Sequence, residues 1–337
     1  MIGVSGTGAW PGDAVLEAQT TVLGDLADVP SEVAGLPFAV HLPARGPWAT
    51  LTGRTLGLLV DLPAELGPHG WKLADRPGGD LARVHATTRE DLDALAVAGH
   101  GYDGPLVVPV LGPVTLAATT YLARGDRAVG DPGALRDLAD SLATGLGEHL
   151  AALARSVPGA RPVVLVHEPL LAQAVAGVLP SFSGYARLRP VRGPLAGERV
   201  GAVVAGARAA GAGTVVVHGG AAWTTLPVVR ASGADAVALE VAALGDQGWE
   251  RVAEAVEAGT RLWAHLPPQR SSQCAGPDAV GQARTLTDPW RAVGLPAAGL
   301  DDVVLLAPEP AGGPDEARGA LAGVVRAARV VAEVAHG

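Results

Sequence analysis

Short runs of β-branched and aliphatic residues recur along the chain, each followed by a polar or glycine-containing turn and an Ala/Leu-rich amphipathic segment. This alternation is typical of parallel sheets, in which helices return the chain to the start of the next strand. Eight strands are predicted, at 2–8, 37–42, 106–111, 162–167, 214–218, 235–240, 261–266 and 303–307. Eight such units favour a (β/α)8 barrel, because open doubly wound sheets usually contain five or six strands.

Helices are predicted between these strands, at 13–27, 49–62, 87–98, 132–155, 197–210, 223–231, 248–258, 278–292 and 314–335. The helix at 132–155 has a clear start signal, since Asp131 can cap it and Pro132 suits its first position. The stretch from 63 to 86 is predicted to be an insertion between strands 2 and 3. The chain as a whole, residues 1–337, is therefore predicted to be one α/β domain, a single TIM barrel with that insertion.

Composition narrows the classes of partner. Hydrophobic residues make up 48% of the chain and charged residues 18%, a balance typical of a large buried core. The net charge of -9, without a Lys/Arg cluster, disfavours nucleic acid. No long uninterrupted apolar stretch occurs and the first residues lack the basic start of a secretion signal, which predicts a cytoplasmic protein with no membrane partner. Cys274 is the only cysteine, so an internal disulfide and a CxxC metal site are excluded.

The predicted strand ends carry the candidate chemistry, because a barrel of this kind has its active site at the carboxyl ends of its strands. Four consecutive predicted strands end near His167, His218, Glu240 and His265. Neighbouring strands lie about 4.8 Å apart, so these side chains converge if each points inward. The alternative is that some of them face outward or only hydrogen-bond the loops.

Several strand-end motifs also carry a family resemblance: "TGAWPG", "GPVTLA", "VHEPLL", "VVVHGG", "GADAVALE" and "LLAPEPAG", in this order. Together they resemble the catalytic barrel of the cobalamin-independent methionine synthases, and more widely the barrel superfamily shared with uroporphyrinogen decarboxylase. The resemblance extends over essentially the whole chain. "GPVT" at 112–115 is its closest literal match, and "HEP" stands where the family has Asp-Glu-Pro.

The resemblance implies transfer of a methyl group from a methylated folate to the thiol of homocysteine, with a zinc ion that converts the thiol to a thiolate. The family binds zinc through His, Cys, Glu and Cys. His218 matches the histidine and Glu240 the glutamate, whereas the two cysteine positions fall on Gly220 and Pro310. The aspartate expected to hold the amino group of homocysteine corresponds to His167.

The first functional hypothesis is therefore methyl transfer to a thiol with a rearranged zinc site. Its predicted metal ligands are His218, Glu240 and Cys274, and its predicted catalytic residues are His167, Glu168 and His265. Its predicted substrate-binding residues are Arg45, Thr115 and Trp223. The expected partner is a small-molecule substrate, with zinc as cofactor and a methylated folate as co-substrate.

Two other hypotheses stay open from the sequence. His167, His218 and Glu240 form a two-histidine, one-carboxylate set, as in hydrolytic zinc and non-haem iron sites, and without a metal they could serve as general acid and base. Alternatively, glycine and proline at ligand positions indicate a barrel without catalysis that binds a small molecule or a protein partner.

Overall fold

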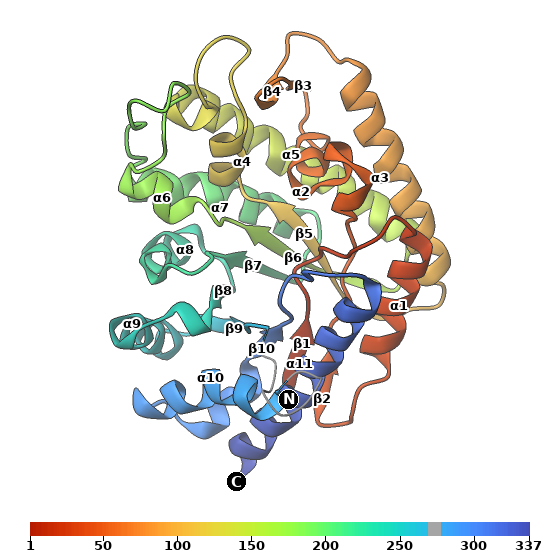
Figure 1. Cartoon of the computed structure of the whole chain (residues 1–337), viewed down its shortest axis with the longest axis vertical. Coiled ribbons are helices and arrows are strands. Elements are labelled where there is room, and N and C mark those ends of the chain that lie inside the picture. Colours follow the sequence, from red (N-terminus) through yellow and green to blue (C-terminus); the bar gives the residue numbers. More distant parts are fainter. Residues whose placement is uncertain (269–277) are drawn as a thin grey trace.

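The computed structural model describes residues 1–268 and 278–337. Its main sheet contains eight parallel strands in the order β2-β1-β10-β9-β8-β7-β6-β5 (Figure 1). The strands are β1 (Ile2–Ser5), β2 (Val33–Gly35), β5 (Gly104–Leu111), β6 (Ala160–His167), β7 (Thr214–His218), β8 (Ala236–Glu240), β9 (Arg261–His265) and β10 (Val304–Leu306). The predicted α/β class and the number of parallel strands are confirmed, and seven of the eight strands lie at predicted positions.

The two edges of this sheet meet through the segment that follows β2. The Ala39 N–H donates to the Val107 carbonyl and the Val107 N–H donates to the Pro37 carbonyl, each at 2.8 Å. The sheet is therefore curled into a barrel-like form. The predicted second strand differs from the structure: β2 ends at Gly35, and residues 37–41 make only isolated bridges. Pro37 lacks an N–H, which interrupts the ladder at that point.

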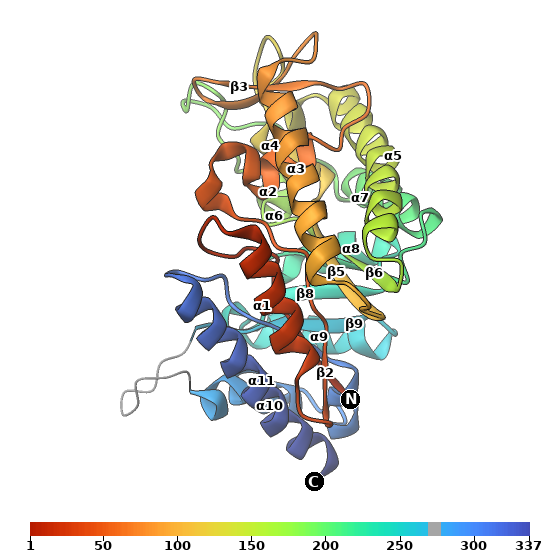
Figure 2. The same ribbon diagram turned by 90° about the vertical axis from the view of Figure 1, so that its right-hand side faces the viewer.

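Helices cover the outside of the curled sheet, and Figure 2 shows α1, α3 and α11 running along one side of it. The helices are α1 (Val15–Ala27), α2 (Leu51–Leu56), α3 (Gly79–Ala98), α4 (Pro113–Thr119), α5 (Pro132–Ser156), α6 (Leu171–Ala176), α7 (Gly193–Ala209), α8 (Leu226–Ser232), α9 (Asp246–Glu257), α10 (Ala279–Ala292) and α11 (Pro314–His336). Short 3-10 turns lie at η1 (Pro43–Arg45), η2 (Pro47–Ala49), η3 (Ala128–Gly130), η4 (Trp223–Thr225), η5 (Val241–Ala243) and η6 (Ala297–Asp302). In the described part of the chain no helix is both long and apolar enough to span a membrane.

The region from 63 to 86 holds an antiparallel hairpin, β3 (Ala64–Gly67) with β4 (Gly70–Leu73), and the first turns of α3. Helix α3 thus begins earlier than the predicted helix at 87–98 because the polar positions before residue 87 belong to its solvent face. Helices α4 and α6 were not predicted. They have 7 and 6 residues, and a segment of about two turns is too short for helical periodicity to stand out.

The barrel interior is lined by Val, Leu and Ala from the strands, and the small residues let helices approach closely. In β6 and β7 the runs Val163–Val166 and Val215–Val217 are buried. Gly145 on α5 lies directly against the backbone near α2, where an added Cβ would stand 1.6 Å from the Leu58 carbonyl oxygen. Glycine is required at this contact because any side chain would displace α5.

We expect Gly145→Ala to destabilise the fold by about 1–3 kcal/mol or more, since the extra methyl group overpacks a backbone contact. Gly147→Ala is the matched control two residues further along α5, where an added Cβ meets its nearest neighbour, Ala210 Cβ, at 3.7 Å. The control should be stabilising by roughly 0.5–1 kcal/mol, because alanine favours the helix over glycine. Chemical denaturation measures both, and equal effects of the two substitutions would contradict the proposed contact.

Candidate metal centre

Backbone register brings three chemically active side chains together at the carboxyl ends of β7, β8 and β9. Glu240 pairs with His265 across β8 and β9, and His218 lies opposite Ala238, two residues before Glu240. The ligand atoms of His218, Glu240 and His265 all lie within 4.8 Å of one another. This spacing lets two imidazole nitrogens and one carboxylate oxygen approach a single cation.

His218 is buried and His265 is half-buried, and both carry ring nitrogens without hydrogen-bond partners among the described residues. His218 is 6% exposed, and neither of its ring nitrogens has a partner among the described residues. The Nδ1 of His265 is also buried and unpartnered in that part of the chain. Buried polar atoms in proteins are normally satisfied, so these nitrogens are suited to a ligand.

Burial also sets the protonation state of the cluster. It lowers the pKa of His218 well below the usual value, with further repulsion from His167 and His265. Burial lowers the pKa of His265 to about 4. Both rings are therefore neutral near pH 7, which is the form that coordinates a metal. The donor set fits a divalent cation such as zinc.

A cavity of about 700 Å³ opens over the cluster. It is lined by His167, Pro169, His218, Glu240, Ala242, Ala243, His265, Leu266, Pro267, Pro268, Pro308 and Glu309. The prolines were not predicted as site residues, although each of them lies within three residues of a strand end. Their position just after the strand ends is the feature of the sequence from which these prolines could have been predicted as site residues.

His167 lines the same cavity but is held differently. Its Nε2 lies 3.0 Å from the Thr7 carbonyl, so Nε2 carries the proton and Nδ1 is left as an acceptor. Burial lowers its pKa to about 4. Its ring centroid is 5.2 Å from that of His218. Among the described residues, the group whose ligand atoms lie close together consists of His218, Glu240 and His265. One hypothesis from the sequence placed His167 in this group in the position that His265 takes.

Glu168 faces helix α4. Its carboxylate accepts hydrogen bonds from the Val114 N–H at 2.9 Å, the Thr115 N–H at 2.7 Å and the Thr115 hydroxyl at 2.6 Å. Burial raises its pKa to about 7, although these three hydrogen bonds act in the opposite direction. The predicted catalytic Glu168 and the predicted substrate-binding Thr115 therefore anchor the first turn of α4 and are not among the residues that line the cavity.

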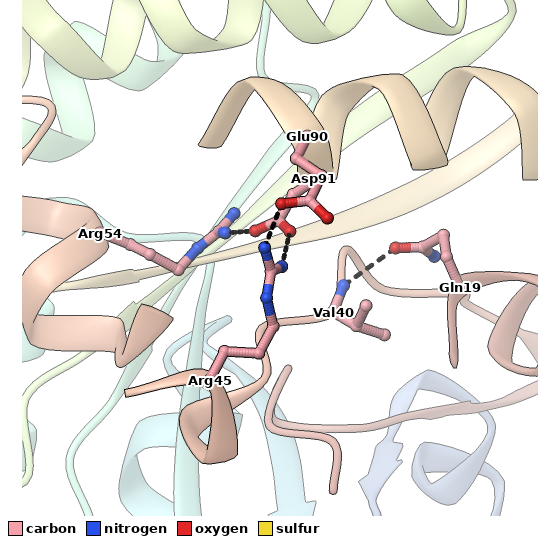
Figure 3. Close-up of polar contacts among 6 residues, drawn as sticks. All are labelled: Gln19, Val40, Arg45, Arg54, Glu90 and Asp91. Carbon is pink, nitrogen blue, oxygen red and sulfur yellow. Dashed lines mark hydrogen bonds and ion pairs between the residues drawn. The ribbon is translucent and has the colours of Figure 1, made fainter. Parts of the chain in front are cut away.

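Arg45 is engaged in ion pairs, as Figure 3 shows. Its guanidinium contacts Glu90, and it lies 2.6 Å from the Asp91 carboxylate. Arg54, which is half-buried, also pairs with Asp91. Both arginines are held against α3. Figure 3 also shows a contact between α1 and the segment after β2. The side-chain carbonyl of Gln19 on α1 accepts a hydrogen bond from the Val40 N–H at 3.0 Å.

The remaining predicted residues lie elsewhere. Trp223 opens η4 after β7 and packs on α9, where its Cδ1 lies 3.1 Å from the position of a Cβ added to Gly248. It is not among the residues that line the cavity. Cys274, the predicted third metal ligand, lies outside the described residues.

Comparison with known proteins supports the fold. No family model matches the sequence, and no protein of curated function matches it. A solved structure of a B12-independent methionine synthase from Shewanella sp. W3-18-1, in complex with selenomethionine, is similar with a TM-score of 0.61 at 12% sequence identity, over 98% of this chain and 97% of that one. The fold of this chain is therefore similar to that of the methionine synthase structure.

A second solved structure is much less similar. The carboxyl transferase domain of Rhizobium etli pyruvate carboxylase with pyruvate matches 66% of this chain and 41% of that one at 12% identity. Its TM-score is 0.25.

The buried His41 predicts acid sensitivity that does not depend on a metal. Burial, with repulsion from Arg54, lowers its pKa to about 3. The unfolded chain takes up this proton near pH 6.5, so stability present above that pH is lost as the pH falls towards 3. At pH 4.5 the loss from His41 alone is about 2–3 kcal/mol.

We expect the free energy of unfolding of His41→Asn to fall less steeply than that of the parent protein between pH 6.5 and 4.5. Denaturant titrations at several pH values measure this slope. His100→Asn, at an exposed histidine, is the control and should keep the parent slope. Identical slopes for His41→Asn and the parent would mean that His41 is protonated in the folded state.

Proposed function

We propose that this protein is a metal-dependent methyltransferase-like enzyme that binds zinc through His218, Glu240 and His265 and methylates a small thiol. The observation that carries the proposal is the convergence of these three ligand groups within 4.8 Å beneath a cavity of about 700 Å³. The likeness of the whole fold to a methionine synthase supports the reaction class. We also propose that residues 1–337 form a single (β/α)8 barrel domain with residues 63–86 as an insertion.

Three protein ligands, His218, Glu240 and His265, suit this chemistry because they would hold zinc and still leave it free to bind the substrate. Zinc, when bound, supplies a Lewis acid that favours the thiolate form of a substrate thiol near neutral pH. The neutral imidazoles of His218 and His265 donate lone pairs, and the Glu240 carboxylate offsets part of the positive charge. By the resemblance of its strand-end motifs, the methyl donor is a methylated folate.

The protein's own residues have distinct roles in this proposal. His167 presents Nδ1 as an acceptor because Thr7 occupies its Nε2. Glu168 keeps α4 in place beside the cavity through three hydrogen bonds. The lining prolines and Leu266 exclude water from the reacting groups. Cys274 stays a predicted alternative ligand.

A hydrolytic enzyme is the second candidate, and the donor set is the observation that favours it. Two histidines and one glutamate without a thiolate also occur in zinc hydrolases, where the open position holds water. The two candidates share the metal centre and differ in the nucleophile. They are therefore separated by the substrate and not by the metal content.

Metal binding tests the shared part of both candidates. Protein purified without a histidine tag should bind one zinc ion, and His218→Ala or His265→Ala should weaken zinc binding at least a hundredfold because two ligands cannot replace three. Competition with a chromophoric chelator measures the affinity. The matched control His100→Ala should bind zinc like the parent, and a parent protein without zinc affinity would overturn the proposed function in favour of a non-catalytic barrel.

Cobalt substitution tests which residue completes the centre. We expect the Co²⁺ protein to show weak visible bands of a nitrogen and oxygen ligand set, with no thiolate-to-cobalt charge-transfer band near the ultraviolet. Cys274→Ser should leave this spectrum and the zinc affinity unchanged. A charge-transfer band that disappears in Cys274→Ser would show that this cysteine is a metal ligand. The two candidate functions are distinguished by an activity assay. Loss of the methyl group from the folate donor that depends on an added thiol would support methyl transfer over hydrolysis.

A further inference from the structure

The cavity over the candidate metal centre has an unusual charge pattern. Its described lining contains two carboxylates, Glu240 and Glu309, and three histidines, but no lysine, arginine, hydroxyl or amide side chain. Glu240 belongs to the proposed metal centre. Glu309 stands exposed at the rim, and among the described residues nothing pairs with its carboxylate. The side chains of the lining are therefore better suited to accept hydrogen bonds and to bind a cationic group than to donate hydrogen bonds to an anion.

The two arginines that follow β2 do not change this pattern. The guanidinium groups of Arg45, a predicted substrate-binding residue, and of Arg54 are both paired with Asp91, and Arg45 also pairs with Glu90 (Figure 3). An arginine that is satisfied by acidic side chains has to give up a partner before it can bind a substrate anion. Residues 269–277, which include Arg270, lie outside the described chain.

A buried substrate carboxylate needs a cationic partner or several donors, because an unpaired anion loses its hydration without compensation. In this cavity the metal centre would be the only cation within the described lining, and a substrate thiolate would occupy its open position. A carboxylate elsewhere on the same molecule would then face Glu309 and apolar walls. Four prolines, Leu266 and two alanines make up most of those walls.

These observations point to the class of acceptor. We propose that the thiol substrate carries no carboxylate and is neutral or cationic at the end away from its sulfur, where Glu309 binds an ammonium or hydroxyl group. The assignment of a thiol rests on the proposed function, whereas the charge selectivity rests on the cavity alone. It excludes homocysteine and other amino-acid thiols as good acceptors, because each of these carries an α-carboxylate.

A matched ligand series tests the proposal: 4-aminobutanethiol, 4-mercaptobutanol and 4-mercaptobutanoate differ only in the terminal group, and a four-carbon spacer disfavours chelation of the metal. Titration calorimetry on the zinc-loaded protein should show the amine and the alcohol binding at least tenfold more tightly than the carboxylate. The preference for the amine should weaken as the salt concentration rises, because Glu309 is exposed. Binding of 4-mercaptobutanoate that is as tight as that of the amine and the alcohol, or tighter, would overturn the proposal. This holds also if Arg270→Ala abolishes the binding of 4-mercaptobutanoate.

Variants locate the selectivity. Glu309→Gln should reduce the advantage of the amine over the alcohol severalfold while leaving zinc affinity unchanged. Glu250→Gln, on α9 and outside the cavity lining, is the matched control and should keep the parent ratio. An amine-to-alcohol ratio that is the same in Glu309→Gln and the parent would refute the role of Glu309.

The same cavity is tested without a metal by n-butylamine and butyrate. Preferential binding of n-butylamine to the metal-free protein supports the charge selectivity even if zinc fails to bind, which would remove only the proposed function. Conversely, zinc binding together with a preference for butyrate would leave the metal centre intact and overturn the selectivity. The two failures are therefore distinguishable.

Discussion

The backbone ladder of the parallel sheet is the constraint on which the rest of this structure depends. In a parallel sheet, the strand register decides which residues stand side by side where the strands end. His167 pairs with His218 across β6 and β7, and Glu240 pairs with His265 across β8 and β9. A slip of one residue in any of these ladders would turn a ligand away from the cavity, since successive side chains point to opposite faces. The cluster therefore exists because the register is set by the many buried valines and alanines below it.

Burial then gives the cluster its chemistry. Removal of His218 and His265 from water lowers their pKa values and keeps both rings neutral. The same burial leaves ring nitrogens without partners, a cost that a bound cation would offset. His167 avoids this cost at Nε2 through the Thr7 carbonyl. The three histidines at this rim therefore differ. His218 and His265 have unpartnered ring nitrogens and are suited to a metal, whereas His167 is already oriented by the loop after β1.

Much of the fold was predictable because it follows from local patterns. Long buried strands such as β5 and β6 and long amphipathic helices such as α5 repeat their period often enough to be recognised. Short elements were missed, and the second strand was misplaced, because Pro37 and the closing hydrogen bonds to Val107 belong to a contact between segments far apart in the chain. The motifs that resemble methionine synthases predicted a barrel, and the similarity to a solved methionine synthase structure supports that fold without deciding the reaction.

The sequence alone determined that polar residues end four consecutive strands, and that Gly220 and Pro310 stand where the resemblance to methionine synthases would place two cysteines. Strand ends are local features, and residue identities need no coordinates. Only the tertiary structure decided that His265 joins His218 and Glu240, that Glu168 faces α4 and that Arg45 pairs with α3. These outcomes depend on the direction of each side chain and on partners distant in sequence. Such partners are brought together only when the sheet curls and the helices pack against it.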